Sequence, residues 1–216
     1  MSQQVRSQIA LRKVLPVVST VLVSLSLWMS PGLAKDPFRT TNARPISDRT
    51  ENAFRAFFER GDYPTAAKYL QQAETTEPLV TAMKASLVYI DMQGEKDAQK
   101  RAAMLEQVRA YAAQTRTNAN SILSQDPLRG NLYLAVGHFL QAGYVLLRDG
   151  TVKGTPEGMR EVQTAMSYLD QAEAKAPNDP EMNLIKGYVE LIMALNIPFS
   201  SPSQAINRLN NNAAPR

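Results

Sequence analysis

Apolar residues recur at helical spacing along most of this chain. From Ser47 onward they fall three and four positions apart, and no stretch alternates apolar and polar residues as a half-buried strand would. Prolines interrupt the pattern at intervals, and proline is tolerated in the first turn of a helix but breaks its interior. The pattern therefore predicts an all-α chain with helices at residues 48–60, 64–76, 79–93, 95–124, 128–148, 156–175, 180–196 and 202–210.

Several helix starts carry a side chain that can cap the open backbone N–H groups. Asp48 with Glu51 matches a capping box for the first helix. Four further starts place a capping residue directly before proline: Asp126-Pro127, Thr155-Pro156, Asp179-Pro180 and Ser201-Pro202.

Two stretches are predicted to interrupt the helices. Thr115 to Asn120 has weak helix propensity, so the helix at 95–124 is expected to bend or break there. The glycine-rich stretch 149–158 is expected to be a long connector. It is no phosphate-binding loop, because Lys153 precedes Gly154 and helices are predicted on both sides.

The first 34 residues have the layout of a secretory signal peptide. Basic residues precede an apolar run of 15 residues, Val14 to Trp28, and Gly32-Leu33-Ala34 forms a small-x-small cleavage site. A membrane span needs about 20 apolar residues, so a retained anchor is the weaker alternative. Arg12-Lys13 is not a twin arginine. We therefore expect export by the general secretion route, to the periplasm or the thylakoid lumen, and a mature form without an integral membrane span.

Removal of that signal leaves three regions. Residues 35–46 contain two prolines and no periodicity, and are expected to be a flexible leader. Residues 47–210 form the predicted helical domain. The polar end, residues 211–216, is expected to be disordered.

Composition excludes several classes of function. The chain of 216 residues has no cysteine and one histidine, so disulfides, thiolate catalysis and Cys-ligated or His-pair metal sites are absent. The net charge is +4, but residues 1–34 hold three basic residues and no acidic one. The remainder is close to neutral and lacks the basic stripe of a nucleic-acid binder. We expect no nucleic acid, no metal and no cofactor.

Helical hairpins repeat about every 50 residues. Pro78, Pro127 and Pro177 are spaced 49 and 50 apart. A fixed period with small residues at fixed offsets is typical of stacked hairpins that bury their apolar faces only against one another. Before these prolines come equivalent residues at offsets of twelve, eight and five: Ala66, Thr115 and Ala165; Leu70, Ala119 and Leu169; Ala73, Ile122 and Ala172.

The first unit carries a resemblance to a known family. Gly61-Asp62-Tyr63-Pro64-x-Ala66-x-x-x-Leu70-x-x-Ala73-x-x-x-x-Pro78 resembles the second half of a tetratricopeptide repeat, and the last unit resembles it too. The middle unit departs from the pattern, and the two later units are longer by about 15 residues. With its signal peptide, the chain resembles exported cyanobacterial tetratricopeptide-like proteins. The resemblance implies a right-handed solenoid of irregular, lengthened hairpins over residues 48–196.

The resemblance also implies a binding groove for a protein or peptide. In such arrays the first helix of each hairpin lines a concave face. The alternative is that the same residues pack against the next hairpin as ordinary core. When Gly137 and Gly187 are placed at the small position of their helices, the residues that face the groove are Arg55, Phe58, Tyr89, Met92, His138, Gln141, Tyr188 and Leu191.

No residue pattern supports catalysis. His138 is a lone histidine on an apolar helix and is expected to be a hydrogen-bonded structural residue, and Asp170 with Glu173 is expected to be solvated charge on one helix. The predicted function is a non-catalytic exported adaptor or assembly factor that holds a protein or peptide in its groove. The alternative is a structural homo-oligomer that pairs through its C-terminal helices, because helix 180–196 is apolar on several sides.

Overall fold

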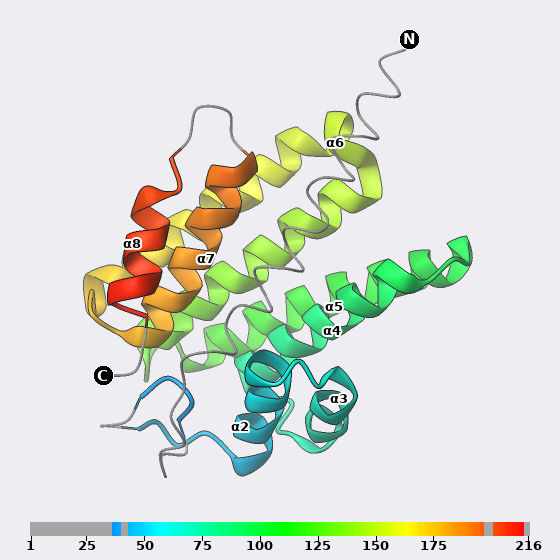
Figure 1. Cartoon of the computed structure of the whole chain (residues 1–216). Helices are drawn as coiled ribbons and strands as arrows, with labels where there is room; N and C mark the ends of the chain where they lie inside the picture. The colour runs from blue at the N-terminus through cyan, green and yellow to red at the C-terminus, as the bar shows by residue number, and fades with distance from the viewer. Residues whose placement is uncertain (1–35, 40–42, 197–200, 214–216) are drawn as a thin grey trace.

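The computed structural model describes residues 36–39, 43–196 and 201–213, and within these the chain is all-α, as predicted (Figure 1). The predicted signal peptide, residues 1–34, and the end of the predicted tail, residues 214–216, lie outside the described residues. The described part contains eight helices: α2 (Asp48–Phe54), its π-helical continuation η2 (Arg55–Glu59), α3 (Tyr63–Gln72), α4 (Pro78–Gly94), α5 (Ala98–Ile122), α6 (Pro127–Lys175), α7 (Pro180–Asn196) and α8 (Ser203–Asn211).

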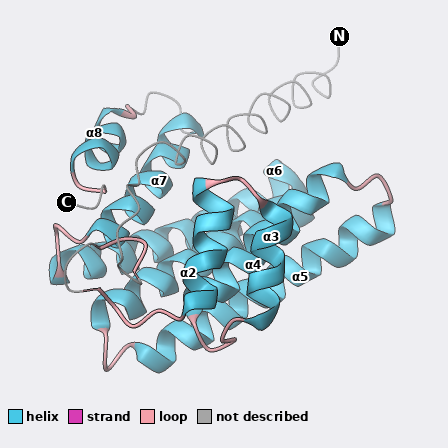
Figure 2. Ribbon diagram, turned by 60° about the horizontal axis from the view of Figure 1, so that its bottom comes forward, coloured by secondary structure: helices cyan, strands magenta, loops and turns pink. Residues whose placement is uncertain are grey.

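The helices pack mainly as sequential antiparallel pairs. Each contacts its neighbour in the sequence, and α4 also contacts α2 and α6. Figure 1 shows α4 beside α5, α6 folded back on itself, and α7 beside α8. The view in Figure 2 brings α2 and α3 to the front.

Proline and capping side chains begin the helices largely as the sequence predicts. Pro64, Pro78 and Pro127 lie in the first turns of α3, α4 and α6, where the missing N–H costs nothing. Asp126 caps α6 by accepting from the Arg129 amide at 2.9 Å.

Two predicted caps are wrong. Helix α2 begins at Asp48, as predicted, but its N-cap is Ser47, whose hydroxyl accepts from the Thr50 amide. Thr155 is not an N-cap, because it lies inside α6.

Helix α5 runs unbroken, so the expected bend or break at Thr115 to Asn120 is absent. Two of its weak helix formers, Thr115 and Asn118, are buried and bonded to α4 and to the loop before it. The Thr115 hydroxyl lies 2.9 Å from that of Thr81, and the Asn118 amide donates to the Thr75 carbonyl at 2.7 Å. These tertiary hydrogen bonds offset the low intrinsic propensity.

The predicted long connector at 149–158 is also wrong. Helix α6 has two antiparallel arms, residues 127–149 and 151–175, and only Gly150 departs from helical geometry, with φ of +75°. Gly154 allows the arms to come close, because a Cβ there would lie 2.8 Å from the Val145 carbonyl oxygen. The glycines therefore serve a tight reversal and close packing of the two arms.

Residues at equivalent positions of the repeat form the core. Leu70, Ala119 and Leu169 are buried in one cluster. The equivalent glycines, however, face different neighbours: a Cβ on Gly137 would meet Ala112 and Arg116 of α5, whereas one on Gly187 would meet Leu209 of α8. The two glycines therefore have different surroundings despite their equivalent places in the sequence.

The region expected to be a flexible leader has no helix in its described residues, but it lies against the domain. We call residues 36–39 and 43–47 the N-terminal strap. Asp36 is 2% exposed, and Phe38 and Ile46 are each 4% exposed. Phe38 packs edge-on against Phe54 of α2, with ring centroids 4.8 Å apart. Buried side chains thus hold the strap in place without regular backbone structure.

No helix in the described part of the chain is long and apolar enough to cross a membrane.

Candidate functional site

Three helix starts face the strap at one end of the molecule. Glu77, Asp126 and Asp179 each accept a hydrogen bond from a backbone amide in the first turn of α4, α6 and α7, at 3.1, 2.9 and 3.0 Å. All three therefore present a carboxylate oriented by its helix. Carboxylates are favoured there because the N-terminus of a helix carries partial positive charge.

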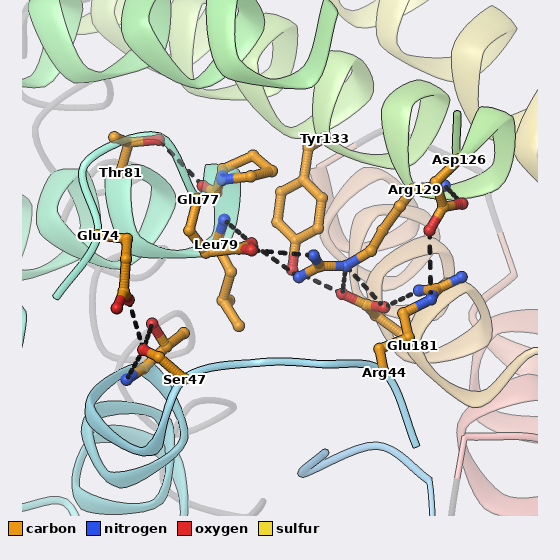
Figure 3. Close-up of polar contacts among 12 residues, drawn as sticks. Arg44, Ser47, Glu74, Glu77, Leu79, Thr81, Asp126, Arg129, Tyr133 and Glu181 are labelled. Atoms are coloured by element: carbon orange, nitrogen blue, oxygen red, sulfur yellow. Dashed lines mark hydrogen bonds and ion pairs between the residues drawn. The ribbon is translucent and has the colours of Figure 1, made fainter. Parts of the chain in front are cut away.

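Glu181, in the first turn of α7, is the centre of the site and is completely buried. It accepts from Arg129 Nε at 3.2 Å and from the Tyr133 hydroxyl at 2.7 Å, both on α6. From the strap it accepts from Arg44 Nη1 at 2.6 Å and from Arg39 Nη1 at 3.4 Å. Figure 3 shows the first three of these groups converging on its carboxylate.

The surrounding ion pairs extend the network to every neighbouring element. Arg129 bridges from Glu181 to Glu77, with two contacts of 2.8 and 3.1 Å, and its guanidinium lies 5.0 Å from the centre of the Tyr133 ring. Arg44 also pairs with Asp126 at 3.3 Å. In this way α4, α6, α7 and the strap share one set of charges, which we call the clasp network: Asp36, Arg39, Arg44, Glu77, Asp126, Arg129, Tyr133, Asp179 and Glu181.

The strap's own residues complete the clasp network. Arg39 pairs with Asp179 and, at 3.0 Å, with Asp36. Asp36 in turn accepts from the amides of Phe38 and Arg44, each at 2.9 Å. Among the described residues, no buried side-chain nitrogen or oxygen lacks a hydrogen-bond partner.

Burial and charge act in opposite directions on the central carboxylate. Burial alone would raise the pKa of Glu181, but Arg129, Arg44 and Arg39 hold that pKa below its ordinary value. Burial raises the pKa of Tyr133 well above its usual value, and the nearby Glu181 charge adds to the effect. The site therefore contains an ionised glutamate and a neutral phenol at neutral pH.

This shift predicts how stability depends on pH. Because the folded pKa of Glu181 lies below its ordinary 4.5, its stabilising effect is present above pH 4.5 and is lost as the pH falls through the folded value. We expect the free energy of unfolding to fall more steeply below pH 4.5 in the wild type than in Glu181→Gln. Urea denaturation at a series of pH values measures both slopes, and equal slopes would contradict the prediction.

The site consists of charged groups that pair with one another and one buried phenol. Apart from the strap, the helices contribute four carboxylates and one guanidinium, and the strap arginines Arg39 and Arg44 pair with three of these carboxylates. Within the described ranges, no group of three or more His, Asp or Glu side chains is placed to hold a metal ion.

The residues predicted on the first hairpin pack close to the strap. Phe58 packs against Phe54, with ring centroids 4.7 Å apart, and Phe54 contacts Phe38 of the strap. Arg55 pairs with Glu51 and Glu59 on the same helix. Phe58 is therefore linked to the strap through Phe54, whereas Arg55 forms its ion pairs with neighbouring residues of its own helix.

The predicted residues on α4 and α7 differ in exposure. Met92 is only 3% exposed and belongs to the core. Tyr89, Tyr188 and Leu191 are half-buried. Burial raises the pKa of Tyr89, and it raises that of Tyr188 to about 12.

His138 is turned toward the second arm of α6. Its Nδ1 lies 2.7 Å from the Glu161 carboxylate, and its ring stacks on Tyr168 with centroids 5.5 Å apart. The prediction of a hydrogen-bonded histidine is confirmed. Gln141, one turn further on, is half-buried.

Sequence reasoning missed the clasp network. Its members are five charged residues at the starts of α4, α6 and α7, the phenol of Tyr133, and three charged residues in a proline-containing leader. Asp126 and Asp179 were predicted as caps from their place before proline, whereas Glu77 was not. The partners were not predicted, because Arg39 and Arg44 lie 142 and 137 residues from Glu181 in the chain.

Comparison with family models, with curated proteins and with solved structures gives no match for this chain.

Proposed function

We propose that the protein is a non-catalytic, exported adaptor or assembly factor of tetratricopeptide-like type. In this proposal it forms a right-handed solenoid and binds a segment of another protein on the face made by the first helix of each hairpin: α2 with η2, α4, the first arm of α6, and α7.

The observation that carries this proposal is the packing of first helices against one another. Helix α4 contacts both α2 and α6, although a second helix separates each of these pairs in the sequence. Contacts of this kind place consecutive first helices side by side, as a stacked array requires. The half-buried Tyr89 and Tyr188 supply aromatic surface of the type enriched at protein interfaces.

A crosslinking experiment tests the proposal. A photo-reactive side chain at Tyr188 is expected to capture one dominant partner in the native organism, whereas the same probe at the exposed Lys100 of α5 captures none. Tyr188→Ala is expected to lower the affinity for the partner about tenfold or more, since buried aromatic side chains contribute most of the binding energy at interfaces. Equal capture at both positions, or full affinity in a folded Tyr188→Ala variant, would reject this face.

A homo-oligomer is the second candidate. Its support is exposed apolar surface on the last two helices, where Leu195 is 50% and Ile206 is 45% exposed. Crosslinks from Tyr188 to a second copy, with a concentration-dependent mass in light scattering, would favour it over the adaptor.

A further inference from the structure

The N-terminal strap lies against α2 and across the starts of α6 and α7. It contacts the first helices of three hairpins: Phe38 packs on Phe54 of α2, Arg44 pairs with Asp126 at the start of α6, and Arg39 pairs with Asp179 at the start of α7. We propose that the strap is an intramolecular occupant of the partner-binding face, and that a partner segment with an aromatic residue and two arginines replaces it. This inference rests on the proposed function for the identity of the face.

The strap is attached as a ligand would be. It forms no helix or strand, and its ion pairs to the helices come from the side chains of Arg39 and Arg44. Its third anchor is the buried ring of Phe38. Residues up to Ile46 can therefore lift without breaking a backbone hydrogen bond of any helix, whereas Ser47 stays in place as the N-cap of α2, where its carbonyl accepts from the Glu51 amide.

The receiving carboxylates are organised without the strap. Asp126 and Asp179 are fixed by the first-turn amides that they cap. Glu181 is held by Arg129 and Tyr133, which belong to α6. The binding surface is therefore preorganised, which lowers the entropic cost of taking up another occupant.

The charge of this surface specifies the occupant. With the strap lifted, Glu77, Asp126, Asp179 and Glu181 are balanced only by Arg129. Guanidinium groups suit such a site because their planar fork can satisfy two carboxylate oxygens and is weakly hydrated. In the structure, where the strap is in place, the Arg44 guanidinium pairs with both Asp126 and Glu181 (Figure 3).

The surface under the strap continues into the residues proposed to meet the partner. Tyr188 follows Glu181 by seven positions on α7, and residues seven apart lie on the same face of a helix, two turns along. Phe58 contacts Phe54, which holds Phe38. In this inference, a partner that binds Tyr188 extends along α7 to Glu181 and there competes with Arg39 and Arg44 of the strap.

A peptide-binding experiment tests the inference. The probe is a fluorescent peptide with the sequence of residues 35–47 of this chain, titrated into the full chain and followed by anisotropy. We expect Arg39→Ala/Arg44→Ala to bind it at least tenfold more tightly than the wild type, in which the site is occupied. The exposed Arg60→Ala variant is the matched control and should behave as the wild type.

The peptide itself supplies a second control. A version with both arginines replaced by alanine should bind neither protein. Equal affinity of the wild type and the double variant for the original peptide would overturn the inference, and so would equal binding of the two peptides.

Hydrogen exchange covers the case in which the double variant does not fold. In the wild type, the amides of Phe38 and Arg44 donate to Asp36 and should exchange through local opening of the strap. We expect them to exchange at least tenfold faster than the amide of the buried Tyr133 in α6. Exchange at the same rate would show that the strap opens only on global unfolding and would overturn the inference.

These readouts separate this inference from the proposed function. If the Tyr188 probe captures a partner but the wild type binds the peptide as tightly as the double variant, the adaptor function stands and the displacement of the strap is rejected. If the double variant binds the peptide but the Tyr188 probe captures no partner, the displacement of the strap stands and the adaptor function is rejected.

Discussion

Replacement of Glu181 by alanine is expected to lower the free energy of unfolding by about 3 to 5 kcal/mol, because it removes one side of a buried ionic network. The carboxylate is fully buried and accepts from Arg129, Arg44 and Tyr133 at 2.6 to 3.2 Å. Arg129 would remain buried with its charge compensated only by Glu77. Urea denaturation followed by far-UV circular dichroism measures the change.

Glu157→Ala is the matched control. This glutamate is also paired with an arginine, Arg148, at 3.3 Å, but both side chains are about two-fifths exposed. Exposed ion pairs contribute about 0 to 1 kcal/mol to stability, so the control should have nearly the same free energy of unfolding as the wild type. If the two variants lose similar stability, the clasp network does not hold the helix starts together.

Comparison of Glu181→Ala with a variant of the strap arginines separates two contributions of the same carboxylate: its contacts within the helices and its contacts with the strap. It joins α7 to α6 through Arg129 and Tyr133, and it joins both to the strap through Arg39 and Arg44. A change confined to the strap arginines should cost less stability than Glu181→Ala, because their carboxylate partners keep contacts within the helices. A ranking of the variants in this order would agree with a strap that lifts from an already folded domain.

The sequence predicts the helices well because their signals are local. Periodic apolar residues and prolines in first turns act within a few positions, and Pro64, Pro78 and Pro127 all begin helices in the structure. The repeat positions Leu70 and Leu169 are buried for the same reason: their spacing places them on the inward face of each helix.

Features that depend on distant neighbours were not visible in the sequence. The weak helix formers of α5 are stabilised by bonds from Thr115 and Asn118 to α4 and the preceding loop. The strap pairs with residues more than 130 positions away. Neither case leaves a periodic pattern, so propensity and composition indicated a break and a flexible leader.

The glycines of α6 show the same limit. Local propensity treats every glycine in a helix alike, as a cost of about 1 kcal/mol relative to alanine. In the structure they differ: a Cβ on Gly143 would meet nothing within 4 Å, whereas one on Gly130 would lie 2.6 Å from the Leu123 Cα. Only the packing of α6 against the end of α5 separates the two positions.

The same substitution at these two glycines is therefore expected to have opposite effects. Gly143→Ala should raise the free energy of unfolding by up to about 1 kcal/mol, because alanine favours the helix and its methyl group is free. Gly130→Ala should lower it by about 1 to 3 kcal/mol, because the methyl group forces the start of α6 away from α5. Chemical denaturation of the two variants measures the difference, roughly 1 to 4 kcal/mol between identical changes.

The loss at Gly130 should extend beyond its own contact. Gly130 directly follows Arg129, whose guanidinium joins Glu181 to Glu77. A displacement of the first turn of α6 lengthens these contacts, so Gly130→Ala and Glu181→Ala should cost less together than the sum of their separate effects. Strict additivity in that double-mutant cycle would mean that the close approach of α5 and α6 does not position the clasp network. A stabilised Gly130→Ala variant would mean that the two helices are not held at the distance that the structure gives.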